Sequence, residues 1–562
     1  MAKQHYWGTL DPFFESGPIL GRKMANAGFL SALFNSDPFD RYDFFLSHAG
    51  AESTVATAAS KHWPALWNAG KIRLRKRTEL PDALMQECYH AFHLSDCLNA
   101  PAHLARLRNA VSRQIFPITA PTHSISYSRY GQDFLRHLWP GTTPRDAVIA
   151  TSSTAATCVN AYYGMLRRGY GLDVSSHPGP RVEVIPLGVD VTQFTPVDEE
   201  GKRQARMQLG LPAASPVALV FGRISHTSKM DLLPLLRAFQ RLRRNNRAQD
   251  AVLVLAGWTD EQEDFTGMLR QLARNIGVSL SIFPRPDDTQ KTAIYAAADV
   301  FVSIADNVQE TFGLTLLEAQ AAGLAVVASD FDGYRDLVVD GQTGYLIPTT
   351  MPSRTDFLDM MAPLLHDNQT HLLLAQETVV DVPILAERLG RLLDDPAYAI
   401  TLGLSGRERV CTRFSWNYVI QEHLCLWERL NAISLEVTEQ WRAQPHPLHI
   451  AYGEVFSNYP TRQPEAIGYV AATATGQAVY QGKDAPIFYQ FAETVLESRI
   501  VKHALFLARK SILSTVLVQV LMERFSQLSE EKALAHVLWM LKQDLLERKE
   551  NASTLSVSKA SS

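Results

Sequence analysis

The sequence has few cysteines and little net charge, and each shortage excludes a class of protein. Its 562 residues include five cysteines, which are widely spaced and form no C-x-x-C pair. Neither a disulfide framework nor a cysteine zinc site is therefore expected. The formal net charge of −4 gives the chain no overall attraction to nucleic acid or to an anionic membrane. The sequence thus predicts no nucleic-acid partner, and any anion site must be local.

The sequence also lacks a signal peptide and a long apolar run. Its start, MAKQHYW, does not have the charged-then-apolar layout of an export signal. The most apolar long segment, Leu505 to Met522, is interrupted by Arg509 and Lys510, so we expect an amphipathic or buried helix there. These features predict a cytoplasmic protein, and peripheral contact with the inner face of the membrane remains an alternative.

Short β-rich segments alternate with helical patterns in two successive series. This alternation predicts parallel sheets covered by helices. We expect an α/β fold of two Rossmann-like, doubly wound domains that face a cleft, with ligands bound beyond the carboxyl ends of the strands. The expected strands lie at 43–47, 115–119, 147–150 and 182–186, and then at 217–221, 252–256, 280–283, 300–303 and 325–328.

The acidic, turn-like segment from Pro196 to Gly201 is the expected linker between the two domains. It predicts an N-terminal domain over 1–197 and a second domain over 198–432. Residues 351–382 break the alternation and are expected to form a helical or irregular insertion. A mainly helical extension over 433–550 and a disordered, serine-rich tail over 551–562 complete the prediction.

Two glutamates eight residues apart, Glu310 and Glu318, stand in the segment ETFGLTLLEAQAAG. Gly313 allows close approach of backbone to a ligand, and Leu314 to Ala322 is predicted to open a buried helix, with Glu318 near its start. The N–H groups at a helix start suit a diphosphate, and carboxylates accept hydrogen bonds from sugar hydroxyls. The alternative is a capping box, in which Glu318 only caps the helix.

A second candidate group follows the first strand of the second series, in the segment VFGRISHTSK. Gly222 ends the strand, Arg223 follows it, and Lys229 precedes a helical run. Two cations around a glycine turn suit a leaving diphosphate, because they would neutralise its developing charge. The alternative is that both are ordinary solvated surface charges.

From about residue 180 to residue 430, the motifs resemble those of the retaining family 4 glycosyltransferases, which have the GT-B fold. The resemblance implies transfer of a sugar from a nucleoside diphosphate sugar to an acceptor hydroxyl with retention, and it implies neither a metal nor another cofactor. The acceptor, whether glycan, lipid or small molecule, stays open. The segments that carry it are VIPLGVDVTQFTP (184–196), Gly222-Arg223 with Lys229, AADVFV (297–302), the Glu310–Glu318 motif and GQTGYLIP (341–348).

In that family the first glutamate contacts the donor sugar and the second the ribose, while the arginine and lysine bind the diphosphate. The resemblance carries these roles to Glu310, Glu318, Arg223 and Lys229. The accompanying glycine turn and the backbone contacts at the helix start fall on Gly222, Phe312, Gly313 and Leu314. The family's second domain also closes with an aromatic-rich helix that crosses back to the first, and the segment from Arg413 to Leu430 resembles it.

The first half matches the family less closely. Gly17-Pro-Ile-Leu-Gly21 resembles the family's N-terminal glycine loop, although the usual adjacent glycine pair is missing. His123 stands where relatives place a histidine near the donor sugar, and the alternative for a lone histidine is a structural role. Gly17, Gly21 and His123 are therefore candidates of a second rank.

The second half also departs from the family pattern. Asp332-Gly-Tyr-Arg-Asp336 replaces the usual Gly-Gly-x-x-Glu, and Leu187 replaces a customary Asn, which could alter the choice of sugar. Asp330-Phe-Asp332 also spells the D-x-D metal motif of the other glycosyltransferase fold. Its place after a strand makes a coincidence the preferred interpretation, so no metal is predicted.

Two rival functions and one further charged segment stay open. A GT-B scaffold could bind a nucleotide sugar or a partner protein without catalysis, and a sugar phosphorylase or nucleotide-sugar epimerase could share the fold. The basic run from Lys71 to Arg77 would place Arg73, Arg75 and Arg77 on one face of a strand. A solvated edge strand is the default for such a run, and an anionic lipid or acceptor is the alternative.

Overall fold

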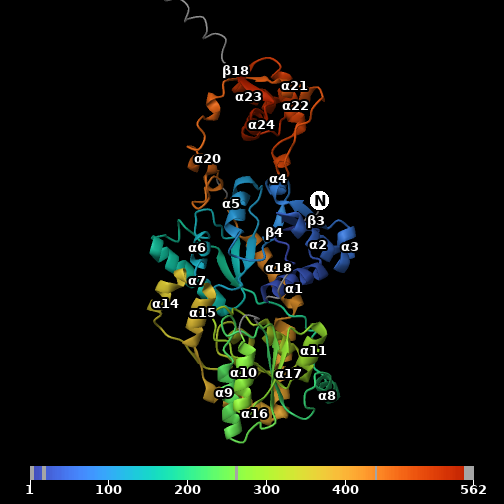
Figure 1. Ribbon diagram of the computed structural model, residues 1–562, viewed down its shortest axis with the longest axis vertical. Coiled ribbons are helices and arrows are strands. Elements are labelled where there is room, and N and C mark those ends of the chain that lie inside the picture. The colour runs from blue at the N-terminus through green and yellow to red at the C-terminus, as the bar shows by residue number, and fades with distance from the viewer. Residues whose placement is uncertain (1–4, 15–20, 260–263, 437–438, 550–562) are drawn as a thin grey trace, which may run out of the picture. The chain divides into compact units, whose positions relative to one another are not determined.

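The computed structural model describes residues 5–14, 21–259, 264–436 and 439–549, and the chain forms two compact units (Figure 1). The first unit comprises Met1–Leu448 and the second His449–Ser562. The first unit carries a seven-stranded and a six-stranded sheet, each covered by helices. This confirms the predicted fold class of two Rossmann-like, doubly wound domains followed by a smaller C-terminal region.

All strand pairs of the first sheet are parallel, and its order is β3-β2-β1-β4-β5-β6-β7. The order reverses between β1 and β4, which is where doubly wound sheets bind ligands. Four of these strands were predicted, whereas β1 and β4 were missed, and β3 coincides with the basic run. The strands are β1 (Tyr6–Thr9), β2 (Arg41–Leu46), β3 (Ile72–Lys76), β4 (Tyr89–His93), β5 (Ile118–Pro121), β6 (Asp146–Ala150) and β7 (Arg181–Val184).

In the part of the chain that the structure describes, seven α-helices connect these strands. They bury apolar side chains against the sheet, in clusters that include Phe45, Phe92 and Val159. They are α1 (Gly21–Ser36), α2 (Ala49–His62), α3 (Pro64–Asn68), α4 (Leu80–Gln86), α5 (Pro101–Val111), α6 (Tyr130–Leu135) and α7 (Ser153–Tyr170). The longest, α7, begins where the hydroxyl of Ser152 accepts a hydrogen bond from Ala155 N–H and ends at Gly171 with φ 64°, the usual start and stop signals of a helix.

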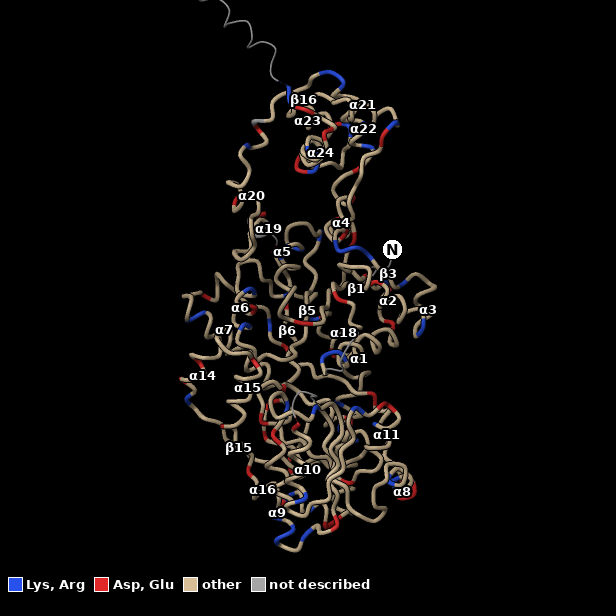
Figure 2. The backbone as a smooth tube through the Cα atoms, viewed as in Figure 1, with Lys and Arg blue, Asp and Glu red and all other residues tan. Residues whose placement is uncertain are grey.

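The basic run lies on the edge strand β3, as expected by default, and the chain's own acids and carbonyls engage two of its arginines. Arg75 forms ion pairs with Glu87 at 3.2 Å and with Glu79 at 3.4 Å. Arg77 lies beyond the strand and donates to the carbonyls of Phe45 and Leu10, so it does not continue a strand face with Arg73 and Arg75. Lys and Arg are interspersed with Asp and Glu along the first unit (Figure 2).

The second sheet is also parallel throughout, in the order β10-β9-β8-β11-β12-β13. All five predicted strands are present and β13 was missed. The strands are β8 (Val217–Phe221), β9 (Val252–Gly257), β10 (Ser279–Pro284), β11 (Val300–Ser303), β12 (Ala325–Ser329) and β13 (Gly344–Ile347). Its helices are α8 (Glu199–Gln208), α9 (Leu233–Arg244), α10 (Phe265–Asn275), α11 (Asp288–Ala297), α12 (Leu314–Ala321) and α13 (Tyr334–Leu337).

The segment that breaks the alternation contains a short antiparallel pair, β14 (Thr349–Thr350) and β15 (Val379–Val380), around α14 (Asp356–Met361) and α15 (Asp367–Gln376). Helices α16 (Val382–Asp394) and α17 (Pro396–Arg413) then pack on the second sheet. The next helix, α18 (Trp416–Ala432), returns to the first sheet and contacts α1 and β4 (Figure 1). Its Trp427 donates to Thr119 Oγ1 at 2.9 Å, which ties this helix to β5.

The first unit ends at Leu448, later than residue 432, where the sequence placed the boundary. Arg442, in α19 (Glu439–Arg442), donates to the carbonyls of Asn109 and Ser112, and His446 is hydrogen-bonded to the carbonyl of Arg136. These contacts attach residues 439–448 to α5 and α6 of the first sheet.

The second unit combines helices with a small antiparallel sheet of order β17-β16-β18. The expected helix from Leu505 to Met522 is wrong, because α22 ends at Leu507 and a short strand intervenes before α23 begins at Ser514. Among the described residues, no helix combines the length and apolar character needed to cross a membrane. The predicted tail over 551–562 lies outside the described residues. The elements are α20 (Tyr452–Val455), β16 (Tyr469–Ala472), α21 (Ala474–Tyr480), α22 (Ser498–Leu507), β17 (Ile512–Leu513), α23 (Ser514–Arg524), α24 (Glu530–Lys542) and β18 (Leu546–Lys549).

Candidate functional site

The glycine turn after β8 lies at the carboxyl edge of the second sheet. Gly222 has a φ of 151°, and its N–H donates to Ala256 O at 2.9 Å. A Cβ added to Gly257 would lie 1.9 Å from the carbonyl oxygen of Gly222, so the two strand ends approach more closely than a side chain allows. Arg223 follows this turn and donates to Ser228 Oγ at 3.2 Å. The local packing therefore fixes the backbone from which Arg223 projects.

Lys229 forms an ion pair with Glu310, the first glutamate of the motif, which lies in the loop between β11 and α12. Only 14% of each side chain is exposed, so both charges are largely withdrawn from water. Burial acts to lower the pKa of Lys229, but the Glu310 carboxylate overrides it and the pKa is raised. Burial acts to raise the pKa of Glu310, but the Lys229 ammonium outweighs it and the pKa is lowered. Both groups are therefore charged near neutral pH.

Tyr334 completes this group from the start of α13. Its hydroxyl lies 3.5 Å from Lys229 Nζ, 3.4 Å from Glu310 Oε2 and 2.7 Å from Ser303 Oγ. Burial raises the pKa of this phenol, so it remains a neutral hydrogen-bonding group. The ring also fills the space beside Gly313, where an added Cβ would lie 2.5 Å from Tyr334 Cε1.

The start of α12 is formed by Phe312, Gly313 and Leu314. Gly313 is the N-cap residue, with a φ of 109° that favours glycine and no side-chain cap. The N–H groups of Thr311 and Phe312 point at Glu310 Oε1, at 3.3 and 3.4 Å. Backbone donors and a helix start thus surround the same carboxylate that Lys229 pairs with, which is an environment suited to an anion.

Glu318, the second glutamate, was predicted to lie near the start of its helix. It is the fifth residue of the eight in α12, so that prediction is wrong. Its Oε1 accepts from Lys291 Nζ at 2.6 Å and its Oε2 from the Tyr295 hydroxyl at 2.8 Å. The capping-box alternative is therefore wrong, since the N-cap is Gly313 and the Glu318 side chain is held from α11 instead. Lys291 Nζ also lies 5.2 Å from the ring centroid of Phe221, the residue before the glycine turn, which brings Glu318 beside the same strand end.

The two carboxyl groups of the D-x-D segment, Asp330 and Asp332, have different surroundings. Asp330 Oδ1 accepts from Arg335 Nε at 2.7 Å, whereas Asp332 adopts a φ of 50° and leaves Oδ2 buried without a hydrogen-bond partner among the described residues. Burial, and then the charge of Glu310, raise the pKa of Asp332 well above its ordinary value. The Asp332 carboxyl therefore lies close enough to Glu310 to feel its charge, at the position where the resembled family has a glycine.

The first sheet contributes its own carboxyl edge to the contact with the second half. Ser152 Oγ donates to the carbonyl of Thr311 at 3.1 Å, and Thr154 Oγ1 donates to the carbonyl of Asp332 at 3.1 Å. Asp336 accepts from the N–H and the hydroxyl of Ser153 at 2.5 and 2.6 Å. The start of α7 therefore touches the loops that carry Glu310 and Asp332.

The remaining candidates of the first half are His123, Gly21 and Gly17. His123 follows β5, and its Nε2 is hydrogen-bonded to the carbonyl of Ser95 at 2.8 Å. Burial lowers its pKa to about 4, so the ring is neutral at pH 7. Gly21 is the first residue of α1, with open space around its Cα, and Gly17 lies outside the described residues.

Leu187, where the family has a customary Asn, lines a small cavity of about 20 Å³ together with Phe29, Thr151 and Trp416. Two buried histidines, His93 and His423, complete its polar lining beside Asn26. A space of this size holds one water molecule rather than a sugar. The cavity therefore lies beside the contact between α1 and α18 and is too small to be a binding pocket.

Sequence reasoning missed three side chains of the site: Lys291, Tyr295 and Tyr334. Lys291 and Tyr295 stand four residues apart on α11, so they share one helix face. Neither belongs to a motif, and the only sequence signal was this spacing just before the AADVFV segment. Tyr334 lies within the segment that was recognised only as a departure from the family pattern.

Part of the chain is similar in sequence to known glycosyltransferases. Residues 201–378 match the model of the family glycosyl transferases group 1. The D-inositol 3-phosphate glycosyltransferase of Corynebacterium urealyticum is 31% identical over 199 residues, which are 35% of this chain and 46% of that protein. The alpha-maltose-1-phosphate synthase of Mycobacterium tuberculosis is 30% identical over 290 residues, which are 51% of this chain and 65% of that protein. The chain thus spans about half to two thirds of the length of the relatives it matches.

Two solved structures share the fold. Anabaena Alr3699/HepE, in complex with UDP and glucose, has a TM-score of 0.50 at 17% identity, over 76% of this chain and 100% of that chain. A glycosyltransferase from Rickettsia africae has a TM-score of 0.50 at 15% identity, over 77% and 100%. At such identities the likeness shows the fold alone, and that fold is GT-B.

Proposed function

We propose that the chain is a retaining glycosyltransferase that moves a sugar from a nucleoside diphosphate sugar to an acceptor hydroxyl, with no metal or other cofactor. One observation carries the proposal. Two cations, Arg223 and Lys229, and the carboxylate of Glu310 meet at a glycine turn and an uncapped helix start. The match of residues 201–378 to the glycosyl transferases group 1 supports the same conclusion.

Each part of the site has a task in that reaction. Arg223, Lys229 and the start of α12 would stabilise the negative charge that develops on the departing diphosphate. Glu318, held by Lys291 and Tyr295, would accept hydrogen bonds from the ribose hydroxyls. The acceptor hydroxyl would attack on the face from which the diphosphate leaves, which gives retention without a covalent intermediate on the protein.

The ion pair between Lys229 and Glu310 implies an exchange of partners when the donor binds. The diphosphate would compete with Glu310 for the Lys229 ammonium, since both are anions. Once Lys229 is drawn to the phosphate, the Glu310 carboxylate can accept a hydrogen bond from a sugar hydroxyl. Glu310 would therefore pair with Lys229 in the empty site and orient the sugar once the donor is bound.

Donor binding is tested first by thermal shift against UDP, GDP and ADP and their sugars, in the full-length protein. A ligand at a hundred times its Kd should add about 2.7 kcal/mol of stability. UDP is the first choice, because Anabaena Alr3699/HepE holds it. The absence of any shift across all three bases would contradict the proposal.

Turnover then separates the rivals. Arg223→Ala should remove about 2–4 kcal/mol of transition-state stabilisation and so lower kcat/KM roughly 30- to 1,000-fold. The control Arg237→Ala changes an exposed arginine on α9 and should leave kcat/KM unchanged. Binding without turnover of any donor would favour a non-catalytic scaffold. Dependence on free phosphate would indicate a phosphorylase, and isomerised donor without acceptor would indicate an epimerase.

A further inference from the structure

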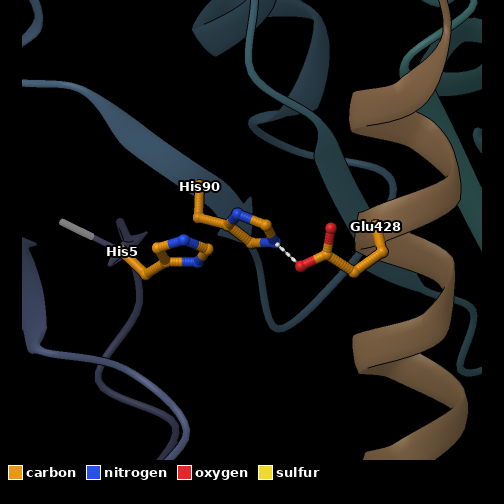
Figure 3. Close-up of side chains that lie close together, drawn as sticks. All are labelled: His5, His90 and Glu428. Atoms are coloured by element: carbon orange, nitrogen blue, oxygen red, sulfur yellow. Dashed lines mark ion pairs between the residues drawn. The ribbon is translucent and has the colours of Figure 1, made fainter. Parts of the chain in front are cut away.

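A separate group of side chains meets at the amino-terminal edge of the first sheet. His5 directly precedes β1, His90 is the second residue of β4, and Glu428 lies on the returning helix α18 (Figure 3). One ligand atom of each residue lies within 4.8 Å of those of the other two. His123 and Ser152 lie beyond the carboxyl ends of β5 and β6, so this group stands apart from the donor site.

The three side chains are brought together by ordered backbone. The N–H of His5 donates to Asp40 Oδ2 at 2.8 Å, and the N–H of Asp40 donates back to the carbonyl of His5 at 3.0 Å. The carbonyl of His90 accepts from the side-chain amide of Asn431 at 2.9 Å, on the same helix as Glu428. Each of the three elements is thus fixed to its neighbour independently of the side chains in the group.

The side chains face one another. The two imidazole rings stack with centroids 4.8 Å apart and an interplanar angle of 22°, and Glu428 Oε1 lies 3.5 Å from His90 Nε2. Figure 3 shows the carboxylate extending from α18 toward the histidines. The Glu428 side chain is 67% exposed and that of His90 only 11%, so the group opens to solvent on the side of the carboxylate.

We propose that His5, His90 and Glu428 bind one divalent transition-metal ion, with Zn²⁺ preferred and water completing the coordination. Two imidazoles and a carboxylate form a recognised zinc donor set, with bonds of about 2.0–2.2 Å. Such bonds place ligand atoms about 3.3 Å apart in a tetrahedral site. The 3.5 Å contact is close to this spacing. The His5 ring, stacked on His90, would have to turn so that its ligand atom, within 4.8 Å of the other two, points at the same ion.

The bound ion would join three distant parts of the chain: the start of β1, the start of β4 and the helix that returns from the second half. Because the folded chain alone presents all three ligands together, the ion stabilises that state by mass action. The site is therefore a cross-link between the N-terminal segment and α18, and it takes no part in sugar transfer.

The test uses the full-length protein without an affinity tag, stripped of metal by a chelator. Titration with Zn²⁺ in a calorimeter should show one saturable site per chain and a raised melting temperature. His5→Gln, His90→Gln and Glu428→Gln should each weaken that binding roughly tenfold or more, since a carboxamide is a poor ligand for this ion. Glu422→Gln on the same helix, outside the group, is the matched control and should bind as the parent does.

Glu428→Gln keeps the test sharp if the half-buried histidine variants fold poorly, because its side chain is largely exposed. Co²⁺ in place of Zn²⁺ supplies a second measurement, as its visible absorption reports the ligands directly. A spectrum that changes in Glu428→Gln but not in Glu422→Gln would support the site. No saturable uptake, or uptake that is equal in Glu428→Gln and the parent, would overturn it, whether or not the protein transfers sugars.

Discussion

The buried pair of Lys229 and Glu310 should be energetically coupled far more strongly than an exposed pair. Lys229→Met leaves the Glu310 carboxylate 14% exposed without its cation, and removing one partner of a buried pair costs about 3–5 kcal/mol. We expect the lower end, because the N–H groups of Thr311 and Phe312 still point at Glu310. For the second half of the first unit, residues 198–432, about 3 kcal/mol corresponds to a fall of about 6–12 °C in melting temperature.

A double-mutant cycle with Glu310→Gln measures the coupling by calorimetry. The double variant should lose less than the sum of the single variants, by at least about 2 kcal/mol. The matched control is the pair of Arg203 and Glu200 on α8, whose atoms approach to 2.7 Å but whose side chains are 56% and 53% exposed. The corresponding cycle there should give below about 1 kcal/mol. Equal coupling in the two cycles would refute the argument that burial of Lys229 and Glu310 strengthens their interaction.

The same two variants should differ in their effect on nucleotide affinity. Lys229→Met removes a phosphate-binding cation, so the Kd of the nucleoside diphosphate should rise. Glu310→Gln removes the anion that competes for Lys229, so that Kd should fall or stay unchanged. Weakening of the sugar-free nucleotide in both variants would contradict the exchange of partners.

Two further predictions concern the ribose side and the response to acid. Tyr295→Phe removes the 2.8 Å hydrogen bond to Glu318. The Kd of the donor should therefore rise about fivefold to tenfold, equivalent to about 1 kcal/mol. A calorimetric Kd equal to that of the parent would contradict a role for Tyr295 in positioning Glu318. Burial lowers the pKa of His123, His137 and His423 to about 4 from the ordinary 6.5. Between these two pH values the unfolded chain binds protons that the folded chain does not, so stability should fall as the pH drops from about 6.5 toward 4. A melting temperature that is constant from pH 7 to pH 4.5 would contradict this.

The strands that could be predicted are those whose own sequence has a clear apolar pattern. The apolar runs of β8, β9 and β12 lie in the middle of the second sheet and are buried on both faces, so composition alone revealed them. Strand β4 reads YHAFH and β1 reads YWGT, and neither short segment is distinguishable from a loop without its neighbours. Strands β1 and β4 become recognisable only through their pairing with each other in the folded sheet.

The candidate site divides in the same way. Glu310 and Lys229 could be named because their roles follow from a motif, but their direct contact joins residues 81 apart in the sequence. The capping box failed because Thr315-x-x-Glu318 describes only local spacing, whereas Lys291 and Tyr295 reach Glu318 from another helix. Tertiary partners of this kind carry no local signal, so the sequence could propose the site but not the contacts that organise it.

The return of α18 has a consequence for synthesis. The first sheet is complete in sequence at Val184, yet Trp427 of α18 bonds to Thr119, 308 residues earlier. At about 5–20 residues per second, a ribosome needs some tens of seconds to make the intervening chain, during which the buried surface of β4 and α1 that α18 will cover is bare. The second sheet is made wholly within that interval, so the domain that begins first is the last to be closed.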